Sequence, residues 1–356
     1  MRYYQNIAME ASKKDIVWIN TVKALGILLV YFFHTEFYMK MNLTSFHSLY
    51  TPFFTNCFFF VSGYLLLGRQ WNSEYLELPF KKWYNGIPKG SGKEQVSNIL
   101  FRIAIPTVIF SSLLFIPKIV LRGEPFQIQL FLHDTIFGGS IWFTCSLAVS
   151  QLIIWILLAA RIKNKLAYLC ISVILTIIAV YFAKDAEGNY GTTDVPWFWK
   201  GGFVATIYLV GGGIYHRLEQ QIHHYLSKIY ILLPTLILYI LLALYLNSNV
   251  LVSINIGMFN SWGALMSFVS ILLVIELCRK VPYNKCIEYI GRHTLVLYFM
   301  SGAIPNVLAL TITKLLGANI CTYVACSILS FIVAIPVTIF VNRYVPFLTD
   351  IRKFRK

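Results

Sequence analysis

The chain alternates between long apolar stretches and short polar stretches along its whole length. The apolar stretches are about 18–25 residues long, which is the length that an α-helix needs to cross about 30 Å of hydrocarbon. Transmembrane β-strands would instead give alternating segments of about ten residues. The pattern predicts an all-α, polytopic integral membrane bundle of about ten transmembrane helices, at residues 16–37, 51–68, 99–120, 140–160, 166–183, 198–215, 228–247, 256–278, 289–313 and 321–342.

Composition excludes a soluble protein, and the distribution of charge argues against a nucleic-acid-binding protein. Of the 356 residues, 58% are hydrophobic and 13% are charged, whereas soluble domains carry about 25% charged residues. The net charge is +15, but the basic residues are spread over short loops between apolar stretches. The lipid bilayer, and no nucleic acid, is therefore the predicted environment.

The basic residues also predict the orientation of the chain. When the N-terminus is placed inside, 24 of the 30 Lys and Arg residues fall on the inner side and 6 on the outer side. This is the bias that the positive-inside rule requires. Both termini are therefore predicted to be cytoplasmic. Because no polar stretch is long enough for a soluble domain, residues 1–356 are predicted to form a single membrane domain.

The first predicted span carries an ionisable residue at each end of its apolar core. Lys23 and His34 are eleven residues apart in the stretch VKALGILLVYFFH. This separation equals three helical turns plus about 20°, so both side chains project from one face, about 16.5 Å apart along the axis. A charged group near the bilayer centre costs about 2.5–3.5 kcal/mol, and such residues usually face a bundle interior or a water-filled cavity.

Each of these two residues has a plainer interpretation when it is taken alone. Lys23 lies near the cytoplasmic end of its span and can extend its ammonium group to the inner headgroups. His34 can be a hydrogen-bonded residue at the interface. Their shared face favours a functional pair over these alternatives. Asn20 lies on the same side as Lys23, whereas Glu36 lies about 200° round from His34 and is predicted to cap the outer edge.

Other stretches hold residues that either pack helices together or line a passage. Ser62 and Gly63, in the second span, are small residues of the kind that lets helices approach closely. Trp142, at the start of the fourth span, belongs either to an aromatic belt or to a cavity lining. Arg292 lies at the cytoplasmic mouth of the ninth span. The seven cysteines contain no CxxC pair, and no metal site is predicted.

Five motifs, taken in chain order, resemble those of the acyltransferase-three family of polytopic membrane O-acyltransferases. In the first, INTVKALGILLVYFFH, Lys23 and His34 match that family's basic residue, ten further residues, and histidine. The second-span motif is FFFVSGYLL, and the entry to the third span is FRIAIP, which contains Arg102. The fourth span contains SIWFTCSL, and the ninth begins with IGRHTLVLY. The resemblance extends over the chain from end to end.

The chain departs from this family pattern at three positions. Asn20 stands where the family commonly has Asp, and Lys23 stands where Arg is commoner. A lysine cannot grip a phosphate through two parallel hydrogen bonds as an arginine does. Ser301 stands where the family often has a histidine in the ninth span.

The resemblance implies an enzyme that transfers an acyl group, by default acetyl, from a cytoplasmic donor. The donor would be acetyl-CoA or another short acyl-CoA, and the acceptor a hydroxyl of a cell-surface glycan or its lipid-linked precursor. The implied location is the cell membrane, as a multi-pass protein of a bacterial inner membrane. His34 would be the general base, and the donor phosphates would be held by Lys23, Arg102 and Arg292. The remaining site-lining residues would be Asn20, Ser62, Trp142 and Tyr298.

Two other classes of protein fit the same apolar pattern. A transporter or flippase of glycans or lipid-linked sugars could use the same helices without an acyl donor. A receptor or structural membrane module would need no turnover, but the costly pair of ionisable residues on one face argues against it. Turnover of acetyl-CoA by the purified protein distinguishes the enzyme from both alternatives.

Overall fold

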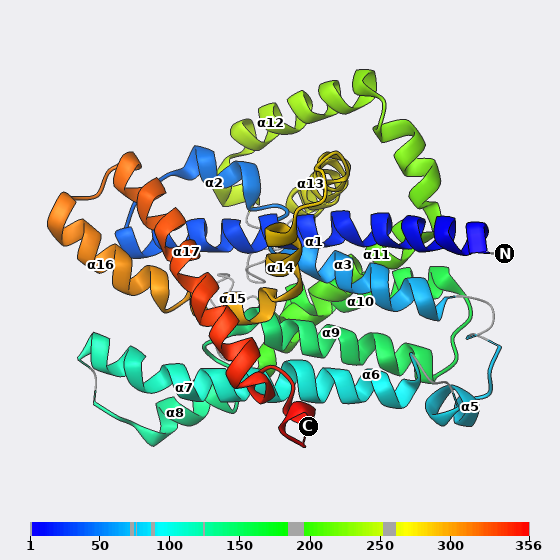
Figure 1. Cartoon of the computed structure of the whole chain (residues 1–356), viewed down its shortest axis with the longest axis horizontal. Coiled ribbons are helices and arrows are strands. Elements are labelled where there is room, and N and C mark those ends of the chain that lie inside the picture. The colour runs from blue at the N-terminus through cyan, green and yellow to red at the C-terminus, as the bar shows by residue number, and fades with distance from the viewer. Residues whose placement is uncertain are drawn as a thin grey trace. The chain divides into compact units, whose positions relative to one another are not determined.

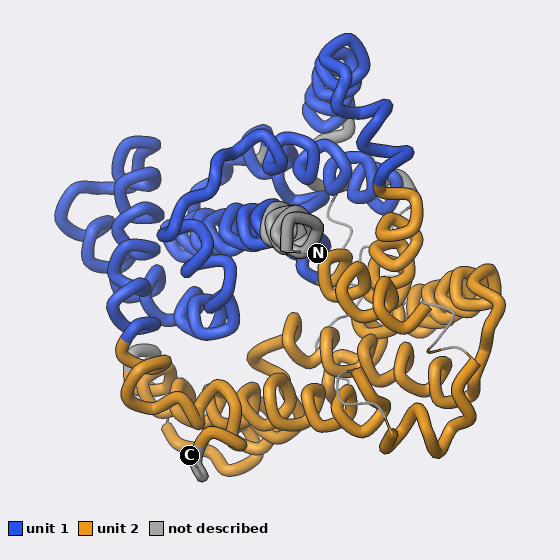
Figure 2. The backbone as a smooth tube through the Cα atoms, turned by 45° about the vertical axis from the view of Figure 1, so that its right-hand side comes forward, with its two compact units in different colours: residues 1–58, 220–251, 261–339 blue, residues 59–219, 252–260, 340–356 orange. Residues whose placement is uncertain are grey.

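The computed structural model describes residues 2–71, 75, 77–86, 90–123, 125–183, 196–251 and 261–355. These residues contain helices and no strand, which confirms the predicted all-α class (Figure 1). The chain divides into two compact units (Figure 2). Unit 1 comprises residues 1–58, 220–251 and 261–339, and unit 2 comprises residues 59–219, 252–260 and 340–356.

Unit 1 is organised around α1 (Arg2–Met39). Half of the apolar window of this helix is buried, the largest share among the candidate membrane spans of the described residues. Four later helices pack against it: α13 (Ser261–Arg279), α14 (Lys285–Arg292), α15 (Thr294–Ser301) and α16 (Ile304–Leu316). The short α2 (Thr44–Tyr50) packs on α12 (Ile229–Leu251), which also contacts α13. Helix α1 therefore forms the centre of unit 1.

Unit 2 contains the middle of the chain and the C-terminal segment. Its helices are α5 (Phe80–Asn85), α6 (Gly92–Ile99), the π-helix η1 (Leu100–Ala104), α7 (Ile105–Arg122), α8 (Ile128–Thr135), α9 (Trp142–Ala159), α10 (Lys165–Ala183), η2 (Pro196–Phe198), η4 (Pro346–Leu348) and η5 (Ile351–Arg355). Three further helices have residues in both units: α3 (Asn56–Gln70), α11 (Trp199–Leu226) and α17 (Ile320–Tyr344).

Glycines allow α3 and α11 to pack in backbone contact within unit 2. A Cβ atom at Gly63 would lie 1.9 Å from the carbonyl oxygen of Leu209, and one at Gly212 would lie 1.9 Å from that of Phe60. Only a residue without a side chain fits such a contact. Close helix packing at Gly63 was one of the two interpretations that the sequence offered, and the structure supports it.

The number of membrane spans is not confirmed at ten. Five helices of the described residues are long and apolar enough to cross a membrane, or up to seven if each of two bent helix pairs counts as one span. Each predicted span nevertheless coincides with at least one helix. The second predicted span shows one cause of the difference. Helix α3 has 15 residues, about 22 Å of helix, which is shorter than the hydrocarbon layer.

Two predicted spans differ from the structure in their internal form. The third was expected at 99–120, but its helix begins at Gly92 and contains the π-helical turn η1. The ninth was expected as one helix over 289–313, but it is divided among α14, α15 and α16, with a bend of 44° between the last two. An apolar pattern reports which residues avoid water and carries little information about breaks in a helix.

Candidate active site

Helix α1 carries three of the predicted site residues in unit 1. It runs from Arg2 to Met39 without interruption, so the spacing between Lys23 and His34 spans three helical turns, about 16.5 Å. Asn20 is buried, and Lys23 and His34 are half-buried. Neither of the two ionisable side chains is therefore exposed on the outside of unit 1.

Helix α14 packs directly on the Asn20 end of this face. A Cβ atom at Gly291 would lie 2.3 Å from the carbonyl oxygen of Asn20 and 2.6 Å from its Cα atom. The absence of a side chain at Gly291 therefore sets how closely α14 approaches α1. This contact places Arg292 near Lys23, close enough for electrostatic repulsion between the two cations.

Three side chains near Asn20, including its own, carry hydrogen-bond donors. The Nδ2 atom of Asn20 is buried and has no hydrogen-bond partner among the described residues. Among the described residues, Lys23 also makes no hydrogen bond or ion pair. Arg292 forms an ion pair with Glu288 one turn earlier on α14, and its side chain is more than half exposed. A buried donor without a partner costs about 1–3 kcal/mol, and a bound anion would supply the missing acceptor.

The contacts of the His34 side chain with described residues include two aromatic rings. Its imidazole stacks on Tyr38 at a centroid distance of 6.1 Å and meets Phe33 edge-on at 5.7 Å. No described residue hydrogen-bonds to either ring nitrogen. Glu36 instead accepts hydrogen bonds from the Leu43 backbone and the Tyr50 hydroxyl, at 3.1 and 3.5 Å. Both imidazole nitrogens thus remain available to a bound molecule, whereas the Glu36 carboxylate is bound to the start and the end of the following helix α2.

Helix α15 is held along the His34 segment of α1 by two tyrosines. The Tyr31 hydroxyl donates to the carbonyl oxygen of Leu297 at 2.8 Å. The Tyr38 hydroxyl donates to that of Gly302 at 2.9 Å. His34 lies between these two tyrosines in the sequence of α1. Tyr298, on α15, lies between the two acceptor residues, Leu297 and Gly302. The structure therefore brings the backbone that carries Tyr298 to the level of His34.

The other predicted site residues belong to unit 2. Ser62 is half-buried on α3, beside the close contact that Gly63 makes with α11. Trp142 begins α9, and its ring meets that of Phe143 at 5.9 Å. The close helix contact beside Ser62 suits a packing role, which was its alternative to lining a passage. For Trp142 the two interpretations, an aromatic belt and a cavity lining, stay predictions.

Arg102 is the remaining basic residue predicted to hold the donor. It lies on the π-helix η1, and its side chain is 59% exposed. Its Nε atom forms an ion pair of 3.0 Å with Asp350 of the C-terminal segment. Lys23 and Arg292 are therefore brought together within unit 1, whereas Arg102 is held by a contact within unit 2.

Comparison with known protein families gives one match that covers most of the chain. The sequence model of an acyltransferase domain matches residues 16–339, which is nearly the whole chain. The chain belongs to the acyltransferase-three family of membrane acyltransferases. Comparisons with curated proteins and with solved structures found no match.

Family membership makes this chain a multi-pass membrane protein and an acyltransferase for groups other than amino-acyl groups. The region matched to the acyltransferase domain includes Asn20, Lys23, His34, Arg102 and Arg292. It ends before the C-terminal segment that binds Arg102. In the described part of the chain, no three His, Cys, Asp or Glu side chains form a group that could hold a metal ion.

Two acidic residues that form ion pairs in the structure, Asp350 and Glu276, were not predicted from the sequence. Asp350 was passed over, although it is the only acidic residue in the basic segment RYVPFLTDIRKFRK. Glu276 was passed over inside an apolar stretch, where an acidic residue is itself a signal. Its carboxylate is buried, 2.7 Å from Nδ1 of His223 on α11, and Arg279 lies one turn later on α13.

Proposed function

We propose that this acyltransferase moves an acetyl group, or another short acyl group, from cytoplasmic acyl-CoA to a hydroxyl of a cell-surface glycan or its lipid-linked precursor. The observation that carries the proposal is that two different kinds of polar group lie at separate positions along α1. Unpartnered donors lie at the Asn20 end, and an imidazole without a hydrogen-bond partner among the described residues lies three turns away at His34.

The donor-rich end suits the phosphates of CoA. The positive charges of Lys23 and Arg292 repel each other, and a phosphate between them would turn that repulsion into two charge-assisted contacts. The buried Asn20 amide would gain the acceptor that it lacks. The pantetheine arm would then run along α1 and bring its thioester toward His34. The eleven-residue spacing thus corresponds to the reach of the donor.

The proposed reaction uses His34 as a general base and then as a general acid. Neutral imidazole accepts the proton of the acceptor hydroxyl, whose oxygen attacks the thioester carbonyl carbon. The carbon–sulfur bond breaks, and the departing CoA thiolate takes the proton from the imidazolium. The products are an O-acyl ester and free CoA, and His34 returns to its neutral form. The hydrogen-bonding capacity of His34 is free for these two transfers.

A topological argument supports a shared side for Arg102 and the C-terminal segment within unit 2. The contact between Arg102 and Asp350 joins the start of the third predicted span to the C-terminal segment. Both were predicted to lie inside from the charge bias, and the contact requires only that they lie on one side. The proposal places this side in the cytoplasm of a bacterial cell, where acyl-CoA is made.

The test is turnover of radiolabelled acetyl-CoA by the purified protein in detergent, with transfer to a sugar hydroxyl and release of CoA as readouts. We expect wild-type turnover, and loss of turnover by at least a hundredfold in His34→Ala. The matched control is His224→Ala, which removes an exposed imidazole on α11. Wild-type protein that binds a lipid-linked sugar but releases no CoA would contradict the proposal and favour a transporter. Full activity in His34→Ala would contradict the catalytic role.

A further inference from the structure

The C-terminal segment folds back onto the beginning of the third predicted span in unit 2. After α17 ends at Tyr344, the short helices η4 and η5 lead the chain past η1. Asp350 lies between η4 and η5, and its carboxylate is 7% exposed. This segment lies outside the residues that match the acyltransferase domain. The family match therefore says nothing about the role of this segment.

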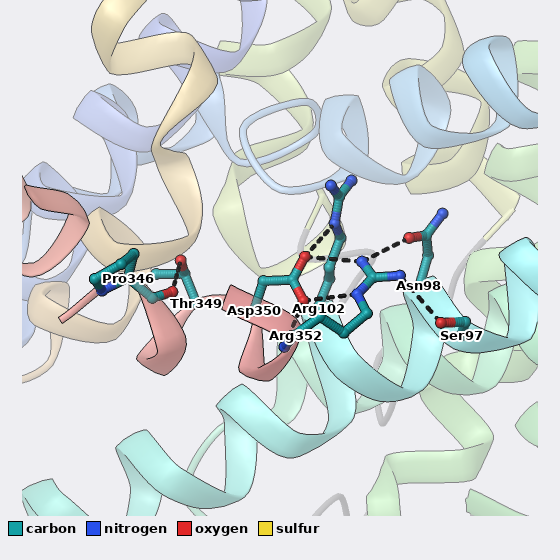
Figure 3. A network of polar contacts seen from close by, with 7 residues as sticks. All are labelled: Ser97, Asn98, Arg102, Pro346, Thr349, Asp350 and Arg352. Carbon is teal, nitrogen blue, oxygen red and sulfur yellow. Dashed lines mark hydrogen bonds and ion pairs between the residues drawn. The ribbon is translucent and has the colours of Figure 1, made fainter. Parts of the chain in front are cut away.

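The carboxylate of Asp350 is surrounded by donors (Figure 3). One oxygen accepts from Nε of Arg102 at 3.0 Å and from Nη2 of Arg352 at 2.8 Å. The other accepts from Nε and the backbone nitrogen of Arg352, at 2.8 and 3.2 Å. The hydrogen bonds from Arg352, which outweigh the effect of burial, hold the pKa of Asp350 well below its usual range. Asp350 is therefore ionised throughout the physiological pH range.

The two arginines are used differently by this carboxylate. All three guanidinium nitrogens of Arg352 donate hydrogen bonds within the protein, because its terminal nitrogens also donate to Ser97 and Asn98 at 3.0 Å each. Arg102 engages only Nε, and no described residue accepts a hydrogen bond from its two terminal nitrogens. Figure 3 shows these two nitrogens directed away from the other side chains drawn. Arg352 therefore binds the C-terminal segment to α6, and Asp350 of that segment orients Arg102.

The charges leave this arrangement ready for an anion. Within the cluster of Arg102, Asp350 and Arg352, two guanidinium groups share one carboxylate. The charge of Glu94 also acts on Arg352, whereas the side chain of Arg102 is 59% exposed. The exposed end of Arg102 presents two nitrogens in a plane, which is the geometry that binds two phosphate oxygens at once. The π-helical turn beneath it is a distortion that is frequent at functional sites.

We propose that Asp350 is a positioning residue, which holds Arg102 through Nε so that its two terminal nitrogens bind a phosphate group of the acyl-CoA donor. The inference rests on the proposed function, since the phosphate is that of the donor. Without Asp350, the Arg102 side chain would be free to adopt many rotamers, and ordering it on binding would weaken the contact. The expected consequence is weaker donor binding with unchanged chemistry.

The experiment compares two donors in lipid-free detergent: acetyl-CoA, and S-acetyl-pantetheine, which carries the thioester without the nucleotide phosphates. We expect Asp350→Asn and Arg102→Gln each to raise the KM for acetyl-CoA by about tenfold with little change in kcat. Neither variant changes the KM for S-acetyl-pantetheine. The double variant is no worse than Arg102→Gln alone. The matched control, Lys353→Gln, removes an exposed charge from the same segment and leaves both KM values unchanged.

Other results would overturn the inference. An unchanged KM for acetyl-CoA in Arg102→Gln, whose exposed side chain is safe to replace, shows that the residue does not bind the donor. Equal losses with both donors show that the segment only maintains the fold. An effect that appears only in nanodiscs containing phosphatidylglycerol assigns Arg102 to a lipid headgroup instead. Wild-type protein that turns over neither donor refutes the proposed function itself, whereas an active wild type with unaffected variants refutes only the role of Asp350.

Discussion

Replacing Gly291 by alanine tests whether the approach of α14 to α1 builds the donor end of the site. The new Cβ atom would lie 2.3 Å from the Asn20 oxygen and 2.7 Å from its carbonyl carbon. Ordinary contact begins near 3.4 Å, so α14 must move away from α1 by about 1 Å. The contacting atoms belong to the backbone of a helix and cannot rotate aside.

The magnitude follows from two opposing effects. Alanine is a better helix former than glycine and would by itself stabilise α14 by about 0.5–1 kcal/mol. Forcing an extra carbon into a packed contact costs about 1–3 kcal/mol. The net of these ranges is about 0–2.5 kcal/mol, so we expect Gly291→Ala to lower the free energy of unfolding by about 1 kcal/mol. The shift also moves Arg292 away from Lys23, so the KM for acetyl-CoA should rise by about tenfold.

Two assays on one preparation measure these effects. Thermal unfolding in detergent reports stability, and steady-state kinetics with varied acetyl-CoA reports the KM. The matched control is Gly302→Ala, because a Cβ atom at Gly302 meets nothing within 4 Å. A Gly291→Ala protein as stable as the wild type, with an unchanged KM, would refute the claim that this contact positions the donor end.

Three further predictions concern the charge, packing and pH behaviour of the protein. Lys23→Ala should raise the KM for acetyl-CoA, whereas Lys23→Arg should keep the wild-type KM. A change in the KM for the acceptor alone would exclude a role of Lys23 in phosphate binding. Gly63→Ala should prevent recovery of folded protein by size-exclusion chromatography, since its Cβ atom would lie 1.9 Å from the Leu209 oxygen, whereas Ser62→Ala should be recovered normally. Because the pKa of Asp350 is depressed in the folded protein, its stabilisation is complete above its unfolded pKa of about 3.9 and is lost only as the pH falls through the folded value. The Tm difference between wild type and Asp350→Asn should therefore be constant from pH 5 to 9, and a difference that vanishes within that range would contradict the ion pair.

The sequence was most informative where the structure depends on local periodicity. The helical class follows from the length of the apolar stretches, and the shared face of Lys23 and His34 follows from the rotation per residue of one unbroken helix. The close contact at Gly63 was signalled by small residues in apolar surroundings. Each of these features is determined by residues near one another in the chain.

Features that join distant segments were beyond such reasoning. The contact of Gly291 with Asn20 brings together residues about 270 positions apart, and no periodic pattern specifies which helix packs on which. The ion pair of Arg102 with Asp350 depends on the return of the C-terminal segment to η1. The break of the ninth predicted span at His293 depends on backbone geometry that the apolar pattern does not encode.

The most direct test of the proposed mechanism is an electron cryomicroscopy structure of the protein with a non-hydrolysable acetyl-CoA analogue. The account predicts phosphate oxygens within hydrogen-bonding distance of Asn20, Lys23 and Arg292, and the carbonyl of the acyl group beside the imidazole of His34. A donor bound with its phosphates away from Lys23, or with its acyl group remote from His34, would contradict it.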